Sequence, residues 1–414
     1  MTLTDVRSRF RDPTAAELQL IAKYAELPED ARRARAFEAF AQSGLPHRRM
    51  EQWKWTDFRS GLKSIERPAA RNISRLTPPD AAMVLRFDGQ SWHIPGDLEE
   101  GLAVQEKSQA PALGDAEQLP MAALTASLTG HPQSASVLQI EVSKPLRRPV
   151  FLDFDVSGRE MAFSRVAFVI RPEAGLDVIE QHTGGAGLSS AVIEFSIQKN
   201  ARVTRTLLQS GGADETTAIT GLVSLEENAS YKQTALGFGA GVARIETRLA
   251  YLGAHGVATL NAAYLPAGGM HVDFTSHILH GAESCVTRQL TKGAVAEGGR
   301  GVFQGKFHVP RTIGQYTDAD MQHQALLLDN GAEVFAKPEL EIYADDVECA
   351  HGNTSGQLDE TALFYMQQRG IPLPQARAML TEAFIAEALA DGHPDVVEAL
   401  TCASRDFLRM EGQD

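Results

Sequence analysis

The sequence predicts a mainly β protein whose core is a right-handed parallel β-helix (a solenoid), flanked by N-terminal and C-terminal α-helical regions. Three observations predict it. Short β-type runs, such as VLQIEV at 137–142 and VAFVI at 166–170, follow one another without helices up to about residue 347. A turn recurs between them at a nearly constant spacing, and helical patterns are confined to the two ends of the chain. An ordinary β-sandwich is the second choice.

The recurring turn gives the period. The turns read PEAGLDV, QKNARVTR, EENASYKQ, GAHGVATL and HGAESCVT, and they align on Gly175, Ala201, Ala229, Gly256 and Ala282. Subtraction gives steps of 26, 28, 27 and 26 residues. Short strands that stack turn upon turn form parallel sheets, so a repeat of this length without helices predicts a solenoid. Its open ends need covers, and we expect the terminal helices to supply them.

The chain divides into four expected regions: an N-terminal helical region (1–65), an irregular connecting region (66–136), the β-helix core (137–348) and a C-terminal helical domain (349–414). In the first region a helical pattern over 14–43 is divided by Pro28 and ended by Gly44. The second is rich in Pro, Ala and Gly and holds one candidate hairpin at about 82–94. A last helix is expected from about 394 to 408.

Trp53 and Trp55 follow the first helical region in the run EQWKWTDF. An aromatic pair of this kind either docks a partner or packs the helical segment onto the next domain. We favour packing, because aromatic rings dominate ordinary core contacts.

The composition excludes several classes of partner. The net charge of −14 and the pI of about 5.4 argue against nucleic acid or an anionic membrane as the main partner. No apolar run approaches the roughly 18–20 residues that cross a bilayer, and no secretory signal is recognisable. Three scattered cysteines do not make a disulfide framework. We therefore expect a protein of the reducing cytoplasm.

Common catalytic signatures are missing from the chain. It has no P-loop, no dinucleotide-binding GxGxxG after a strand, no HExxH, no CxxC and no GxSxG. One rival remains, because Asp318 and Asp320 would share one side of an extended segment, as paired acids do in carbohydrate-active β-helix enzymes. The missing secretion signal and the few aromatic residues in the β region argue against it. A purely structural interaction module is the third possibility.

Cys349 and His351 are the leading candidates for chemistry. Residues two apart on an extended segment point the same way, so the thiol and the imidazole would face one target. Both are ligands suited to iron, zinc and iron–sulfur clusters, although two ligands do not complete a four-coordinate site. Taken alone, such a pair is more often a buried thiol and a hydrogen-bonded histidine than a metal site. The following run, 353–356, has turn composition, and a helix should then begin after Asp359.

Cys285 is a second candidate, because it follows His271, His277 and His280. A functional interpretation makes these residues an iron-handling cluster or a persulfide acceptor. We favour an ordinary core thiol, because free cysteine is among the most buried residue types. His277 and His280 would moreover face opposite sides of a strand. Cys402, in the last predicted helix, is assigned to packing.

Three segments carry a resemblance to a known family. CAHGNTSGQLDETALFYMQQRGIP at 349–372, KPELEIYADDVE at 337–348 and EQWKWTDF at 51–58 resemble motifs of the SufB/SufD family, the scaffold proteins of iron–sulfur cluster assembly. The resemblance covers most of the chain and is stronger for the SufD branch than for the SufB branch.

The resemblance implies a β-helix and a non-catalytic subunit of the SUF scaffold. It implies pairing with a SufB-like paralogue, or with a second copy in isolation, and binding of a SufC-like ABC-type ATPase by the C-terminal helices. His351, and secondly Cys349, would lie at the subunit interface, with His351 as a metal ligand. The nascent cluster or iron would be transient and shared with the partner, and this chain alone would bind none stably.

Overall fold

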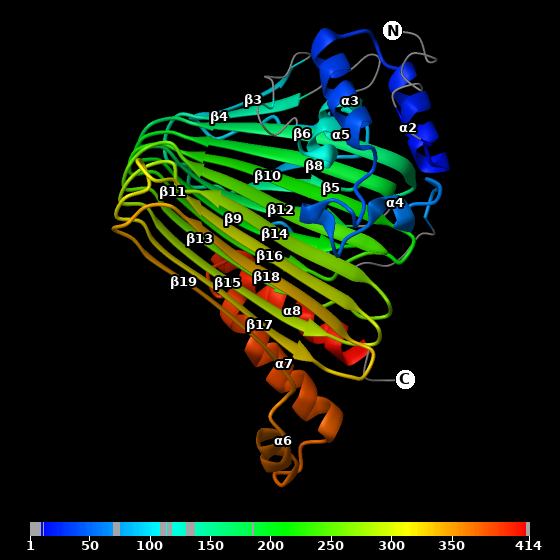
Figure 1. Ribbon diagram of the computed structural model, residues 1–414, viewed down its shortest axis with the longest axis vertical. Coiled ribbons are helices and arrows are strands. Elements are labelled where there is room, and N and C mark those ends of the chain that lie inside the picture. The colour runs from blue at the N-terminus through cyan, green and yellow to red at the C-terminus, as the bar shows by residue number, and fades with distance from the viewer. Residues whose placement is uncertain are drawn as a thin grey trace.

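The computed structural model describes residues 10, 12–68, 75–107, 113, 118–129, 137–183 and 186–410 (Figure 1). Its strands wind into a β-solenoid of about eight turns, with helices toward both ends of the chain, so the predicted fold class is confirmed.

Each turn of the solenoid contributes one strand to each of two facing sheets, called sheet A and sheet B. Sheet A contains β1 (Met83–Phe87), β2 (Trp92–His93), β5 (Val150–Phe154), β7 (Gly175–Thr183), β9 (Arg202–Ser210), β11 (Ser230–Gly237), β13 (Val257–Tyr264), β15 (Val286–Val295), β17 (Asp318–Leu327) and β19 (Glu348–Gly356). Sheet B contains β3 (Leu102–Lys107), β4 (Val137–Val142), β6 (Arg159–Ile170), β8 (Ala186–Ile197), β10 (Thr216–Leu225), β12 (Val242–Tyr251), β14 (His271–Leu279), β16 (Arg300–Val309) and β18 (Glu333–Ile342). Successive strands of a sheet pair in parallel, except where β1 meets β2 and β3 meets β4.

The turn that gave the period forms a ladder along one side of the solenoid. Glu173, Asn200, Asn228 and His255 occupy equivalent places with φ of 64°, 59°, 56° and 61°. The backbone N–H of each donates to a carbonyl of the next turn, for example from Asn200 to Glu227 at 3.0 Å. Asparagine tolerates this left-handed conformation better than most residues do. This accounts for the Asn-Ala pairs at 200–201 and 228–229 in the repeat.

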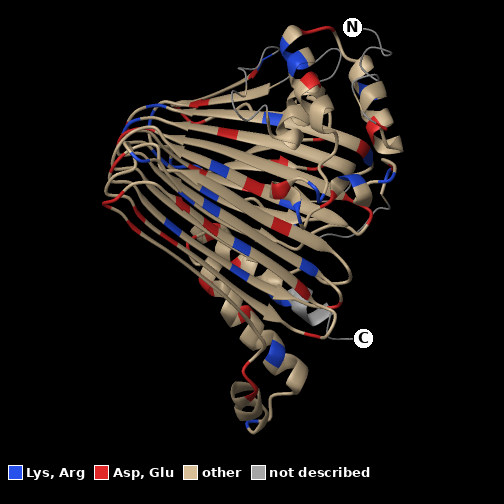
Figure 2. Ribbon diagram, viewed as in Figure 1, with Lys and Arg blue, Asp and Glu red and all other residues tan. Residues whose placement is uncertain are grey.

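The main core lies between the two sheets. Inward side chains of the central strands of both sheets are buried, and Phe168 and Phe195 stack at 4.8 Å on successive strands of sheet B. Positively and negatively charged residues are interspersed along the strands (Figure 2), and some pair across strands of sheet B, as Arg165 does with Glu194.

The N-terminal helices lie on the outer face of sheet B (Figure 1). Here α2 (Ala15–Ala25) and α3 (Ala31–Ser43) are separated as predicted. Thr14 and Glu17 form a capping box at the start of α2, and Gly44 ends α3 with a φ of 66°. The 3₁₀ turn η1 (Glu51–Trp53), α4 (Phe58–Gly61) and α5 (Pro120–Leu128) complete this layer.

The region expected to be irregular contains regular elements. The predicted hairpin is confirmed as β1 and β2, and β1 also pairs with β5, so it begins sheet A. Strand β3 and helix α5 lie in the same region. Proline is compatible with α5 because Pro120 stands at the first position of the helix. The helix is buried along almost its whole length.

The C-terminal helices are α6 (Glu360–Gln367), α7 (Leu373–Leu389) and α8 (Pro394–Met410). The expectation that they cover the open end of the solenoid is wrong. Helices α7 and α8 lie instead on the outer face of sheet A, where Ile385 and Leu389 pack against Leu208 and Leu236. That outer face carries apolar side chains along several strands, and α7 and α8 stabilise the fold by burying them.

The two ends of the solenoid differ as a result. At the N-terminal end, the short strand β2 carries Trp92, whose ring contacts Phe87 and Phe154 at 5.1 and 5.4 Å and closes the core. At the C-terminal end, β18 and β19 are the outermost strands of their sheets. They are ten and nine residues long, and no described strand pairs with their outer edges.

Candidate functional site

Cys349 and His351 lie within β19, the outermost strand of sheet A. They were expected just where a strand ends, with a turn at 353–356. The turn prediction is wrong, because β19 continues to Gly356 and pairs with β17 over its whole length. Pairing with a neighbouring strand outweighs the turn propensity of these residues.

The register shows which way the pair faces. Cys349 lies opposite Ala319, and His351 lies opposite Met321. Ala319 and Met321 are buried in the core, and residues opposite each other in a sheet point to the same face. The thiol and the imidazole therefore share the face that looks between the two sheets. Since β19 is the last strand, Cys349 is only half-buried and His351 is exposed.

The thiol of Cys349 is held in its neutral form. Partial burial, and secondly the negative charge of Asp318, raise its pKa, and only a backbone hydrogen bond from Ala319 opposes the rise. A thiol must lose its proton to bind iron or zinc, so a cation supplied at this place would favour the thiolate.

The residues that the structure describes do not form a complete metal site at this end. Within the described ranges, no group of three or more His, Cys, Asp or Glu side chains is placed to hold a metal ion. Cys349 and His351 give two soft or borderline ligands, and a tetrahedral iron or zinc centre needs four. Further ligands would have to come from another molecule.

Cys285 is a core thiol, as favoured from the sequence. It is completely buried, its Sγ lies 3.5 and 3.7 Å from the carbonyls of Glu283 and Gly253, and burial raises its pKa to about 11. The three histidines that precede it have separate environments: Thr56 contacts His271, Arg248 contacts His277 and Thr287 contacts His280. The iron-handling cluster is therefore not formed.

The two acids of the carbohydrate-enzyme rival are engaged on the outer face of sheet A. Asp318 forms an ion pair with Arg288 at 2.5 Å, and Asp320 accepts a hydrogen bond from Gln322 at 2.8 Å. Both carboxyl groups are partly exposed, and each is engaged by a neighbouring side chain of the sheet.

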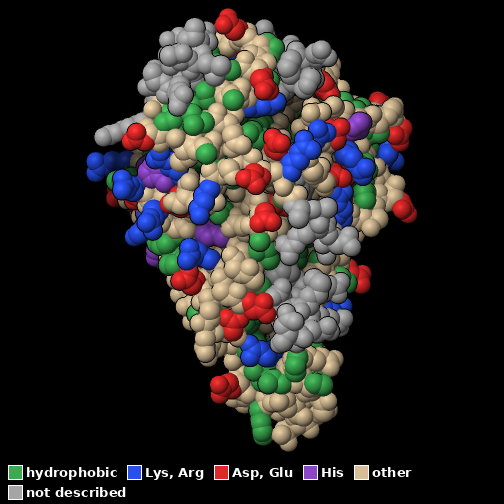
Figure 3. Space-filling view, turned by 90° about the vertical axis from the view of Figure 1, so that its right-hand side faces the viewer, with side chains coloured by type: hydrophobic (Ala, Val, Ile, Leu, Met, Phe, Trp, Pro, Cys, Tyr) green, Lys and Arg blue, Asp and Glu red, His purple; other side chains and the backbone are tan. Residues whose placement is uncertain are grey.

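Trp53 and Trp55 attach the N-terminal region to sheet B, as the packing interpretation predicts. Trp53 is buried with the guanidinium of Arg244 4.0 Å from its ring centre, and Trp55 stacks on Phe335 at 5.9 Å. Trp55 also lines an open groove of about 580 Å³ with Lys54 and Arg300. Figure 3 shows several Lys and Arg side chains gathered toward the left of the view.

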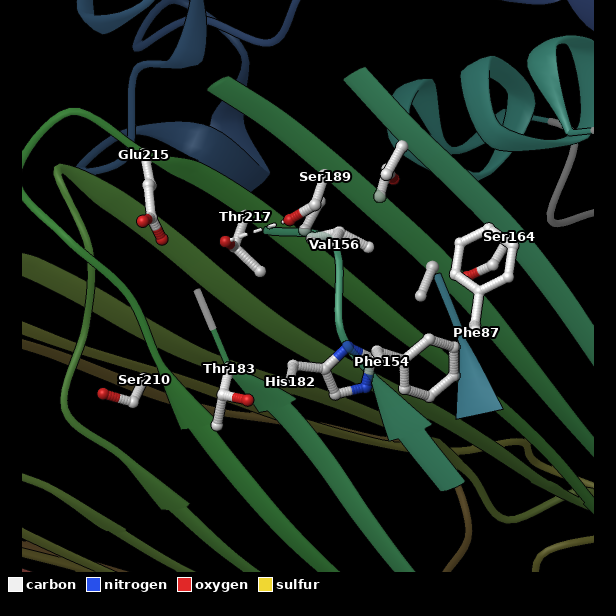
Figure 4. Close-up of a pocket in the computed structure, with 14 residues that line it drawn as sticks. Phe87, Phe154, Val156, Ser164, His182, Thr183, Ser189, Ser210, Glu215 and Thr217 are labelled. Atoms are coloured by element: carbon white, nitrogen blue, oxygen red, sulfur yellow. Dashed lines mark hydrogen bonds between the residues drawn. The ribbon is translucent and has the colours of Figure 1, made fainter. Parts of the chain in front are cut away.

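A small, partly open cavity near the N-terminal end was missed by the sequence reasoning (Figure 4). His182 borders it, stacks on Phe154 at 4.1 Å and contacts Glu180 at 2.5 Å. The cavity measures about 20 Å³, which admits a single water molecule and no substrate. The run of polar residues at 180–183, at the end of the buried strand β7, is a sequence signal for it.

Fold and site together suit a scaffold-type protein: a β-solenoid that offers a thiol and an imidazole at an open edge, where the described residues do not complete a metal centre. Comparison with known proteins is consistent with this class. Residues 154–384 match the family described as SUF system FeS cluster assembly, SufBD core domain, and the chain belongs to that family.

Relatives place the chain near SufD. It is 29% identical over 365 residues to the iron–sulfur cluster assembly protein SufD of Escherichia coli, covering 84% of this chain and 85% of the relative. A SufBD family protein of Synechocystis is 26% identical, with 83% of each chain covered. Protein ABCI7, chloroplastic, of Arabidopsis thaliana is 32% identical over 54% of this chain and 48% of its own. The chain is a SufD-like protein of iron–sulfur cluster assembly. Among its described helices, none has the length and apolar character to cross a membrane.

Proposed function

We propose that this chain is a non-catalytic scaffold subunit that pairs through its open C-terminal end with a SufB-like paralogue. At the seam, which is the contact between the open ends of the two chains, His351 and secondly Cys349 would help to hold iron or a nascent iron–sulfur cluster. The open edge formed by β18 and β19 is the single observation that carries this proposal.

A long unpaired edge strand is a template for pairing with another chain, and proteins that stay alone shorten, cover or charge such edges. Strands β18 and β19 are long, and their inward residues Ala336, Leu340 and Cys349 are only partly buried against the core. A second solenoid set against this end would pair the edges and bury these side chains. Another copy of this chain could do so when the paralogue is absent.

The incomplete ligand set fits a shared site. Cys349 and His351 face the same way at this end and can supply two ligands, and the paralogue would supply the others. The cluster is then cargo that forms between the two chains and leaves, and neither chain alone binds it stably.

The C-terminal helices offer a surface for a SufC-like ATPase. No residue of α6 is buried, and it projects beyond the solenoid (Figure 1). Phe364 and Tyr365 are 61% and 56% exposed, and Leu373 and Met379 at the start of α7 are 41% and 45% exposed. Apolar side chains are also visible on this projection in Figure 3. Exposed apolar groups gathered in one place mark protein contacts.

The ATPase would provide the energy that this chain lacks. Helix α7 joins the projecting α6 to sheet A, so movement of a bound ATPase would be passed to the strands that end at the seam. Nucleotide-dependent association of two ATPase subunits supplies the differential binding that a conformational change requires. The three free cysteines suit a reducing compartment such as the cytoplasm.

The test is cluster content in the complex co-expressed with the SufB-like and SufC-like partners. We expect His351→Ala to lower the iron and sulfide content strongly and Cys349→Ala to lower it less, while the complex still assembles. His93→Ala, an exposed histidine near the opposite end, and Cys402→Ala are matched controls that should leave it unchanged. Unchanged content in the two site variants would favour a purely structural module.

A further inference from the structure

Asn353 lies on the same face of β19 as His351, two residues further along the strand. It is opposite His323 of β17, and its side chain is exposed at the open end. Residues two apart on a strand are separated by about 6.6 Å, so a group bound at His351 lies within reach of the amide of Asn353.

A buried chain of hydrogen bonds holds this amide. The hydroxyl of Tyr264 lies 2.7 Å from Nε2 of His323, and Nδ1 of His323 lies 2.7 Å from Oδ1 of Asn353. Tyr264 and His323 are completely buried, and the ring of His323 stacks on Phe303 at 4.8 Å with an interplanar angle of 3°. The imidazole therefore has one position and two partners.

The chain of donors has one consistent direction. Burial lowers the pKa of His323 to about 4, so its ring is neutral at physiological pH and carries one N–H. Because Oδ1 of Asn353 can only accept, Nδ1–H of His323 donates to it, and the Tyr264 hydroxyl then donates to Nε2. The oxygen of the amide is engaged in this way and the side chain is exposed, so its Nδ2–H groups are available to a molecule at the open end.

We propose that Asn353 is a third residue of the interfacial site and that its Nδ2–H groups donate hydrogen bonds to a sulfur atom, sulfide or thiolate, of the cargo beside His351. His323 and Tyr264 are positioning residues that fix the amide. This proposal rests on the proposed function. Hydrogen bonds to the sulfurs stabilise the more negatively charged states of a cluster and so raise its reduction potential.

Three variants separate the donor from the acceptor. Asn353→Asp keeps an acceptor for His323 but has no N–H to donate, Asn353→Leu has neither, and Asn353→Gln keeps the donor on a longer arm. Because Asn353 is exposed, these changes spare the core. His323→Phe keeps the stack on Phe303 and frees the amide, and thermal unfolding checks that this variant is folded.

The experiment measures the reduction potential of the cluster and its rate of loss to an iron chelator in the complex with the two partners. We expect a lower potential and about tenfold faster loss in Asn353→Leu and Asn353→Asp, a smaller change in His323→Phe, and partial recovery in Asn353→Gln. In the isolated chain, ¹⁵N NMR of His323 should show the Nδ1-protonated ring.

The outcomes are distinguishable. A cluster that forms in the wild-type complex and keeps its potential and its lifetime in Asn353→Leu and Asn353→Asp would overturn the role of Asn353 and leave the proposed function standing. An Nε2-protonated His323 would overturn the orientation of the amide. A wild-type complex that forms no cluster would remove the proposed function and this inference together.

Discussion

His351 lies opposite Met321 in the register of β19 and β17, and the two residues differ sharply in surroundings. Met321 is completely buried in the solenoid, whereas His351 is exposed because no described strand follows β19. The same position in the repeat is thus a core position in one turn and a surface position in the next. A partner that continues the solenoid would make His351 part of a seam.

The reactivity of Cys349 should depend on Asp318. Asp318→Asn removes a negative charge that raises the pKa of the thiol, so more thiolate should be present at neutral pH. We expect alkylation by iodoacetamide at pH 7.5 to become about two- to threefold faster, a small change because Asp318 is partly exposed and screened. Mass spectrometry of the modified peptide measures the rate.

Two comparisons control that experiment. Asp320→Asn, on the same strand, should have less effect, because Asp320 is not among the causes of the shift at Cys349. Cys285 should stay unmodified in the folded chain, since it is completely buried. Equal rates in the wild type and Asp318→Asn would contradict the electrostatic account.

The open end should be sensitive to one added charge. Ile342, at the end of the outermost strand β18, is 36% exposed, so Ile342→Glu should fold normally as an isolated chain. In a seam it would bury an unpaired carboxylate, and we expect affinity for the SufB-like partner to fall at least tenfold. Analytical ultracentrifugation of the two chains measures this. Ile313→Glu, an exposed loop residue, is the control, and equal weakening by both changes would argue against pairing at this edge.

The projecting helix α6 should determine ATPase binding. Phe364→Glu combined with Tyr365→Glu replaces two exposed rings on a helix with no buried residue, so stability should change little. We expect the SufC-like ATPase to be lost from the purified complex while the SufB-like subunit is retained. Leu252→Glu, a 65% exposed residue in a turn of the solenoid, should have no effect. Retention of the ATPase by the double variant would exclude α6 as the docking surface.

The buried pair of Glu180 and Arg205 should make stability depend on pH. Both side chains are completely buried and joined by two hydrogen bonds of 2.7 and 2.9 Å. Burial alone favours the neutral acid, but the charge of Arg205 and the hydrogen bond of His182 outweigh it and hold the pKa of Glu180 at about 2. Unfolded Glu titrates near 4.3, so the stabilisation is complete above about pH 5 and is lost as pH falls toward 2.

Arg205→Met should lower the free energy of unfolding by about 3–5 kcal/mol at pH 7, because it leaves Glu180 buried without its partner. Between pH 5 and pH 2 the loss of stability should be shallower than in the wild type. Urea unfolding at several pH values measures both effects. A variant with the wild-type slope would show that another carboxylate dominates acid unfolding.

The repeat of the solenoid was predictable because one backbone requirement recurs. Asn200 and Asn228 stand where the turn needs a positive φ, and their spacing is the length of one coil. The placement of α7 was not predictable in this way. It depends on apolar residues such as Leu208 and Leu236 that point outward from sheet A, and an alternating pattern does not reveal which face of a strand is covered.

The site was predictable in part for a similar reason. Cys349 and His351 were identified from their spacing and share a face, as two alternate residues of a strand must. Asn353 was assigned to a turn, because its composition suits a turn and its partner His323 is 30 residues away in the sequence. Only the register of β17 and β19 brings these two side chains together.

Hydrogen–deuterium exchange of β19 in the isolated chain and in the complex with the SufB-like partner tests the pairing most directly. We predict that the peptide covering 348–356, whose outer edge is paired with no strand that the structure describes, becomes strongly protected on complex formation. Exchange at 348–356 that stays as fast as in the isolated chain, in a complex that is fully assembled, would show that His351 lies away from the subunit contact and would contradict the account.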